Sequence, residues 1–101
     1  MAEPPDHRVV VLPWLRRVGG LFLSNWLAIT LGRNILAWRA MTASELEHEL
    51  EHVRQWRRFG IAFPLVYVFE SVRQLLAGRR WYHDNRFEAA ARDMAARVRP
   101  R

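Results

Sequence analysis

The chain has 101 residues, of which 50% are apolar and 26% are charged, and its formal net charge is +6. This length supports one domain with a single core, and the composition is that of a folded protein. Because the chain contains no Cys, disulfides and thiolate-held metals are excluded, so a metal ion would need nitrogen and oxygen ligands.

Charge and hydropathy also bear on partners and compartment. The positive charge comes from Arg residues scattered along the chain, which favours a solvated surface and makes no strong case for nucleic acid. The start, MAEPPDHR, lacks the layout of a secretory signal, so we expect a cytoplasmic protein. The apolar runs Leu21–Leu31 and Phe59–Phe69 are shorter than the roughly 20 residues that cross a bilayer. We therefore expect no transmembrane segment, while peripheral membrane contact and a homodimer stay open.

The first half of the chain predicts a strand, a helix and a hairpin. Val9–Leu12 is a short β-prone run. Apolar residues at helical spacing predict an amphipathic helix over Pro13–Trp26. Leu27–Leu31 and Ile35–Trp38 then flank Gly32-Arg33-Asn34, a three-residue connection typical of an antiparallel β-hairpin.

The second half predicts three helices. The first covers Thr42–Phe59, beginning at a Thr-x-x-Glu capping box and stopped by a glycine. The second covers Pro64–Gly78, and the third covers Phe87–Val98 with Asp84 or Asn85 as its cap. The expected fold is α+β, with a small antiparallel hairpin sheet packed on three to four helices.

The segment with the clearest chemistry reads His48-Glu49-Leu50-Glu51-His52. Residues four apart on a helix lie one above the other, so both imidazoles project from one face and can bind a single ion. Glu49 lies beside that face, where its carboxylate can reach a water molecule on the metal. Among random chains of this length and composition, about one in a hundred would contain the His-Glu-x-x-His pattern. The competing interpretation is a charged surface in which both His pair with neighbouring Glu residues.

A catalytic zinc site needs a third protein ligand, which lies outside this motif. We favour Glu88, because Asn85-Arg86-Phe87-Glu88 places a carboxylate in the first turn of a helix that can pack across the motif. The alternative is that Glu88 only completes the cap by returning to Asn85. Spacing alone leaves both roles open.

The helix predicted from Pro64 carries an acidic residue in an apolar run. Glu70 needs a partner there, and an arginine such as Arg54 or Arg73, or the metal itself, would serve. Glu70 is therefore the second choice for the third ligand. Aromatic residues around this helix recur at helical spacing and are expected mostly in the core rather than in a substrate cleft. They are Trp56, Phe59, Phe63, Tyr67, Phe69 and Trp81.

The order of these elements resembles that of a known family. From Leu27 to about Val98, the hairpin, the His-Glu-x-x-His helix, a second helix and an Asn-x-x-Glu start to the last helix resemble the gluzincins. In size the chain resembles the minigluzincins, minimal soluble versions of the catalytic domains of integral-membrane gluzincin peptidases. The likeness rests on HELEHVRQWRRFG and NRFEAAA.

The resemblance implies a single zincin-like metallopeptidase domain over residues 1–101. It implies Zn²⁺ bound by His48, His52 and Glu88, with Glu49 as general base and acid. One position departs from it: related gluzincins commonly carry an Asp one turn after the ligand Glu, whereas this chain has Arg92 there and Asp93 beside it. Loss of that support for a zinc-binding His can weaken metal binding or activity by about 10- to 100-fold. One turn beyond the second His, Gln55 supplies part of that support or is a surface polar residue.

The expected reaction is hydrolysis of a bond in a peptide or protein substrate, in which Glu49 takes a proton from water and gives it to the leaving amine. Tyr82 and His83 are candidates to donate a hydrogen bond to the oxyanion, with packing or capping as the competing role. The strand Ile35–Trp38 could offer its backbone to an extended peptide. The alternative function is a non-catalytic zinc-binding basic module that engages protein or nucleic acid, which the Arg-rich composition supports. A degenerate, latent peptidase that retains metal is a further alternative, and Arg92 keeps it open.

Overall fold

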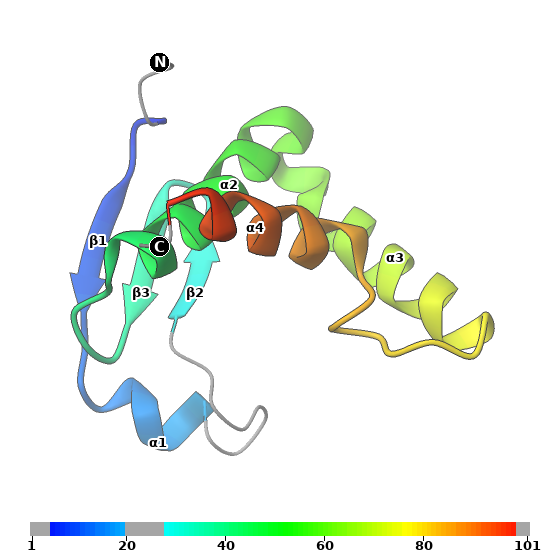
Figure 1. The fold of residues 1–101 in the computed structure, drawn as a ribbon, viewed down its shortest axis with the longest axis horizontal. Helices are drawn as coiled ribbons and strands as arrows, with labels where there is room; N and C mark the ends of the chain where they lie inside the picture. Colours follow the sequence, from blue (N-terminus) through cyan, green and yellow to red (C-terminus); the bar gives the residue numbers. More distant parts are fainter. Residues whose placement is uncertain (1–4, 20–27, 99–101) are drawn as a thin grey trace.

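The computed structural model describes residues 5–19 and 28–98, which form a three-stranded sheet and helices (Figure 1). The expected α+β class is confirmed. In chain order the elements are β1 (Arg8–Val11), α1 (Leu15–Gly19), β2 (Ala28–Leu31), β3 (Asn34–Ala37), α2 (Ala43–Phe59), the 3₁₀ turn η1 (Gly60–Ala62), α3 (Phe63–Leu76) and α4 (Arg86–Arg97). The helix expected over Pro13–Trp26 is present as the short α1, and the rest of that prediction lies outside the described residues.

The sheet has the strand order β1-β3-β2. The expected hairpin of β2 and β3 forms, but its connection has two residues rather than three, because Asn34 already belongs to β3. Gly32 has φ 64° in this turn, a backbone region that favours glycine. The third strand, β1, pairs in parallel with β3.

This order makes β3 the central strand. The prediction that Ile35–Trp38 offers its backbone to a peptide is therefore wrong, because β1 and β2 occupy both of its edges. Among the described residues, the outer edge of β2 has no strand partner. This edge faces the helices.

Helix α2 lies between the sheet and α4 (Figure 1). It begins at the expected capping box, in which Thr42 Oγ1 accepts from the Glu45 backbone N–H and the Glu45 carboxylate accepts from the Thr42 N–H. On the sheet side, its Leu50 and Val53 form the buried core with Ile35 of β3. One face of α2 is thus fixed by apolar packing, which determines where the next face points.

Helix α4 runs antiparallel to α2. Ser44 Oγ, at the start of α2, donates to the Ala95 carbonyl near the end of α4 at 2.9 Å. At the other end, Gln55 Nε2 donates to the Phe87 carbonyl at 3.0 Å. These contacts place the first turn of α4 beside the second half of α2.

Helix α3 projects away from the sheet (Figure 1). The turn before it contains Gly60 with φ 62° and ψ −146°, and Pro64 lies in the first turn of α3, as expected. Phe63 is buried, as expected, and packs edge to face with Phe87, which is also buried, at the base of α3. Phe69 is 70% exposed, so the prediction that it belongs to the core is wrong. Trp81 is also exposed.

Helices α2, η1 and α3 follow one another without a break, over Ala43–Leu76. By length and composition alone, this 34-residue stretch could cross a membrane. The two short apolar runs in the sequence had predicted no transmembrane segment. Only 22% of its most apolar window is buried inside the protein. The α3 part of the stretch therefore presents apolar side chains to the outside.

Candidate metal centre

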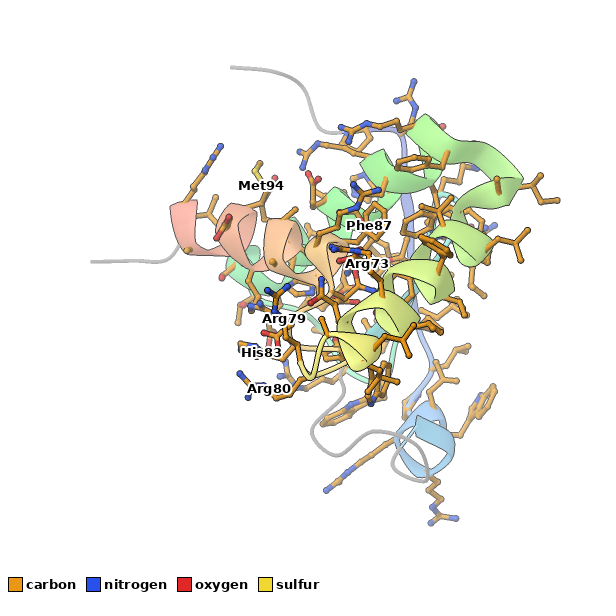
Figure 2. All side chains as sticks on the ribbon, turned by 90° about the vertical axis from the view of Figure 1, so that its right-hand side faces the viewer. Arg73, Arg79, Arg80, His83, Phe87 and Met94 are labelled. Carbon is orange, nitrogen blue, oxygen red and sulfur yellow. The ribbon has the colours of Figure 1, made fainter. Side chains whose placement is uncertain are left out.

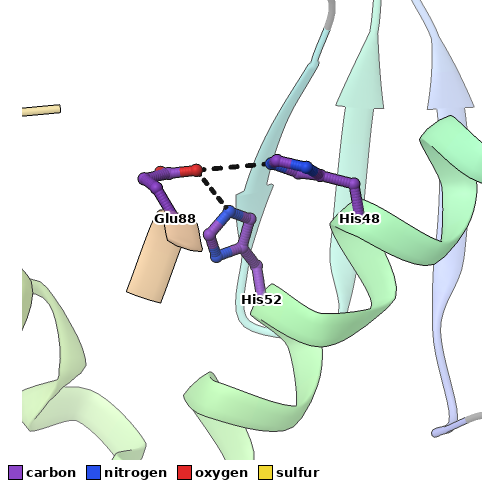
Figure 3. Close-up of side chains that lie close together, drawn as sticks. All are labelled: His48, His52 and Glu88. Atoms are coloured by element: carbon purple, nitrogen blue, oxygen red, sulfur yellow. Dashed lines mark hydrogen bonds and ion pairs between the residues drawn. The ribbon is translucent and has the colours of Figure 1, made fainter. Parts of the chain in front are cut away.

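The two histidines of the motif lie one turn apart on α2, as the spacing predicts. Their ring centroids are 5.2 Å apart, and both Nε2 atoms face α4 (Figure 3). His52 is buried, and the side chain of His48 is 22% exposed. The core residues on the opposite side of α2 hold this orientation.

Glu88 reaches these histidines from the first turn of α4. Its Oε1 lies 3.3 Å from His48 Nε2 and 3.0 Å from His52 Nε2 (Figure 3). The cap of α4 is made by Asn85, whose Oδ1 accepts from the Phe87 N–H, and Glu88 points to the histidines instead. The ligand atoms of the three residues lie within 4.8 Å of one another, so the cluster could hold a metal ion.

Gln55 fixes the orientation and the protonation of His52. The Gln55 amide nitrogen donates to the Phe87 carbonyl, which can only accept, so its oxygen must be the atom 2.8 Å from His52 Nδ1. His52 therefore carries a hydrogen on Nδ1, and in the neutral ring the lone pair of Nε2 points at Glu88 Oε1. Two lone pairs 3.0 Å apart repel each other unless a cation lies between them. Either a proton or a metal ion satisfies this geometry.

The electrostatics of the three side chains follow from that contact. Burial lowers the pKa of His52, but the hydrogen bond and charge of Glu88 outweigh burial and raise it to about 9. For Glu88, burial raises the pKa, and the hydrogen bonds with His48 and His52 outweigh it, so the net pKa is lowered. The site thus favours a carboxylate facing a positive charge.

Glu49 lies next to the cluster without joining it. Its Oε1 accepts from Thr30 Oγ1 of β2 at 3.1 Å, and its Oε2 is 3.9 Å from His48 Nε2. Burial raises the pKa of Glu49 despite the nearby imidazoles. A carboxyl with a raised pKa beside a cation site is a candidate proton acceptor and donor.

A cavity of about 380 Å³ opens beside these groups. Glu49, His52 and Glu88 line its polar side, and side chains of β2, α2 and α3 with Trp81 and Tyr82 line its apolar side. Trp56 Nε1, in the same wall, donates to the Thr30 carbonyl at 3.0 Å. The cavity therefore runs along the unpaired edge of β2.

Tyr67 is a member of this site that the sequence did not single out. Its hydroxyl donates to Glu88 Oε2 at 2.5 Å, so both carboxylate oxygens of Glu88 are engaged. Burial, followed by the charge of Glu88, raises the pKa of Tyr67, which keeps the phenol protonated. The sequence signal for Tyr67 was only an aromatic residue at helical spacing, which usually marks a core position.

The two expected oxyanion donors separate in the structure. Tyr82 lines the cavity, and burial followed by the charge of Glu88 raises its pKa. His83 is not part of the cavity wall: its side chain is 52% exposed, and its Nδ1 lies 2.9 Å from Arg80 Nη2 (Figure 2). Arg92, at the position where the resemblance implies an Asp, donates to the His83 carbonyl at 2.6 Å.

Glu70, the second choice for the third ligand, has other partners. It is buried and accepts from Arg73 Nε at 2.9 Å, from Gln74 Nε2 at 2.8 Å and from the Arg86 backbone N–H at 3.0 Å. The hydrogen bond with Arg73 is the main reason that its pKa is lowered to about 2. Glu70 joins α3 to the start of α4 and is not in the three-residue cluster.

No protein-family model, curated protein or solved structure matches the chain. The interpretation of the site therefore depends on its own geometry and chemistry.

Proposed function

We propose that the chain is a zinc-dependent metallopeptidase that hydrolyses peptide bonds in the cavity beside β2. The observation that supports this best is the convergence of His48 Nε2, His52 Nε2 and Glu88 Oε1, with the Glu49 carboxylate adjacent. Two imidazoles and one carboxylate form the donor set of catalytic zinc sites that keep a position open for water. The lone pair of His52, which Gln55 aims at Glu88, fits a bound cation.

The chain's own residues account for proton transfer. When bound, the ion would supply a Lewis acid for the scissile carbonyl and a lowered pKa for water. Glu49 accepts a proton from the attacking water and later donates it to the leaving amine. The Thr30 hydroxyl holds Oε1 of Glu49, which leaves Oε2 directed toward His48. Tyr82, in the cavity wall, donates to the oxyanion.

The substrate lies extended along β2. Because the Thr30 carbonyl accepts from Trp56, the backbone groups of Thr30 face the unpaired edge, and by alternation so do those of Ala28. A peptide can pair with the free groups there as an added strand. The apolar wall of the cavity favours an apolar side chain next to the scissile bond.

The test combines zinc binding with peptide cleavage. We expect one zinc ion per wild-type chain by titration against a chelating dye, and loss of binding in His52→Ala and in Glu88→Ala. Glu49→Gln should retain zinc and lose cleavage of a fluorogenic peptide mixture. Glu47→Gln is the matched control, because Glu47 lies on the same helix but pairs with Arg54.

Three outcomes would contradict the proposal or one of its parts. Wild-type protein that takes up no zinc and is insensitive to chelators would exclude a metalloenzyme. Stoichiometric zinc without cleavage of any peptide would favour the non-catalytic zinc-binding module. Retention of zinc by Glu88→Ala would remove Glu88 from the ligand set.

A further inference from the structure

Helix α3 buries polar side chains and exposes apolar ones. Its buried residues include Glu70, Ser71 and Gln74. Seven large apolar residues of η1 and α3 are exposed, from 46% for Val72 to 93% for Ile61. We name this surface the outer α3 face; it consists of Ile61, Leu65, Val68, Phe69, Val72, Leu75 and Leu76.

The outer α3 face is continuous. Its residues recur at spacings of three and four, so they form one stripe along the helix. Helix α3 projects from the rest of the protein (Figure 1), and the side chains of this stripe are exposed. A contiguous apolar surface of this kind marks an interaction site in a folded protein.

Positive charge borders the face at both ends. Arg57 and Arg58 precede it, Arg79 and Arg80 follow it, and all four are exposed. Arg79 and Arg80 lie together beyond the end of α3 (Figure 2). From Arg57 to His83 the sequence contains one carboxylate, Glu70, which is buried and paired with Arg73. Beyond it, Asp84 lies 3.9 Å from Arg80 Nε, and Arg79 donates to the Gln74 side chain.

We propose that the outer α3 face docks the protein onto an anionic lipid bilayer, with α3 lying in the plane of the membrane surface. The apolar stripe enters the boundary between headgroups and acyl chains, and the flanking arginines contact lipid phosphates.

An in-plane position fits the structure better than a span. Helix α3 has 14 residues and is about 21 Å long at 1.5 Å per residue, which is shorter than the roughly 30 Å hydrocarbon core. A helix that crosses this core needs about 20 residues, so α3 would have to be extended through the turn at Gly60, with φ 62° and ψ −146°, back to about Arg57 at the end of α2. On its inner side, α3 keeps Glu70 and Gln74 hydrogen-bonded within the protein.

A second copy of the chain is the competing occupant of this face. If two α3 helices paired in parallel, each arginine pair would face the same pair of the second copy. If they paired antiparallel, Arg57 and Arg58 would face Arg79 and Arg80 of the second copy. Like charges in contact disfavour such a pairing, whereas an anionic surface attracts all four side chains. Charge complementarity therefore selects the bilayer.

The experiment is co-sedimentation of the full chain with vesicles in the presence of EDTA, so that its outcome does not depend on zinc. We expect binding to phosphatidylcholine vesicles that contain about one third phosphatidylserine, and at least about tenfold weaker binding to phosphatidylcholine alone. The double variant Leu65→Ser, Phe69→Ser should lower binding at least about tenfold. Its control is Val11→Ser, Trp14→Ser, which alters two exposed apolar residues at the sheet end of the molecule.

Charge is tested separately. Arg57→Gln, Arg58→Gln should weaken binding several-fold, while Arg8→Gln, Arg17→Gln should change it little. Binding should fall in about 1 M NaCl, where the Debye length is about 3 Å. Circular dichroism must show that each variant remains folded.

The proposal is overturned if the wild type stays in the supernatant or if both apolar double variants lose binding equally. Protein that resists both high salt and alkaline extraction would be spanning rather than lying in the plane. A dimer that Leu65→Ser, Phe69→Ser converts to a monomer, without vesicle binding, would assign the face to a second copy.

Discussion

The side-chain oxygen of Gln55 lies 2.8 Å from Nδ1 of His52 and so determines which ring nitrogen faces Glu88. Gln55 is 1% exposed, which excludes its interpretation as a surface residue. Its amide bridges α2 to the Phe87 carbonyl at the start of α4. This bridge holds His52 and the helix that carries Glu88 in a fixed relation.

Replacing Gln55 should therefore weaken metal binding. We expect Gln55→Met to lower zinc affinity by about 10- to 100-fold, because the His52 ring loses the acceptor that fixes its orientation. Gln55→Glu retains an acceptor for Nδ1 and should recover part of the affinity. Competition against a chelating dye measures both, and equal affinities for wild type and Gln55→Met would show that Gln55 only fills space.

Substitution of Tyr82 should lower kcat strongly, whereas substitution of His83 should leave it almost unchanged. Because Tyr82 lines the cavity, we expect Tyr82→Phe to lower kcat by about 100-fold with a smaller change in KM. His83→Ala should leave kcat within about twofold, because His83 is exposed outside the cavity wall. Steady-state kinetics on one fluorogenic peptide gives both values. A larger loss for His83→Ala would assign the oxyanion donor to His83.

Glu70 should contribute to folding stability rather than to metal binding. Glu70→Gln removes the charge that accepts from Arg73, Gln74 and the Arg86 N–H, and loss of such charged hydrogen bonds costs about 1.5–3 kcal/mol. Urea unfolding measures this loss. Zinc affinity should stay within about twofold of wild type, since altered affinity is expected only for groups that hold the ligands. A large loss of zinc binding without a stability change would restore Glu70 as a ligand candidate.

The stabilisation by Glu70 should also depend on pH. Its pKa is lowered from the ordinary 4.5 to about 2 in the folded protein, so unfolding takes up a proton between these values. The contribution is complete above about pH 4.5 and is lost as pH falls toward about 2. The difference in unfolding free energy between wild type and Glu70→Gln should shrink over that interval. A constant difference would contradict the lowered pKa.

A side chain at position 60 should destabilise the folded protein. With φ 62° and ψ −146°, Gly60 adopts a conformation close to a region used almost only by glycine, and we expect Gly60→Ala to destabilise the fold by about 1–3 kcal/mol. Open space surrounds the position, so the cost arises from backbone strain and not from a clash. Gly32→Ala, at φ 64° in the hairpin turn, should cost about 1 kcal/mol. Thermal unfolding of both variants checks that Gly60→Ala destabilises the protein more than Gly32→Ala does.

The sequence alone predicted the elements that depend on neighbouring residues. The capping box at Thr42 and Glu45 and the glycine stop after Phe59 are interactions within a few residues, so their patterns could be interpreted directly. The cap of the last helix was narrowed to Asp84 or Asn85, and the structure has Asn85. The stacking of His48 and His52 also follows from helical periodicity. These features needed no knowledge of the rest of the fold.

Tertiary packing decided the rest. Glu88 meets the histidines, and Glu70 does not, because α4 lies antiparallel on α2 and Glu70 is held at the junction of α3 and α4. Tertiary packing also places β3 between β1 and β2. It leaves the apolar side of α3, including Phe69, exposed. Hydrophobic periodicity shows that a helix has an apolar side, but which side meets the protein depends on contacts between residues far apart in the chain.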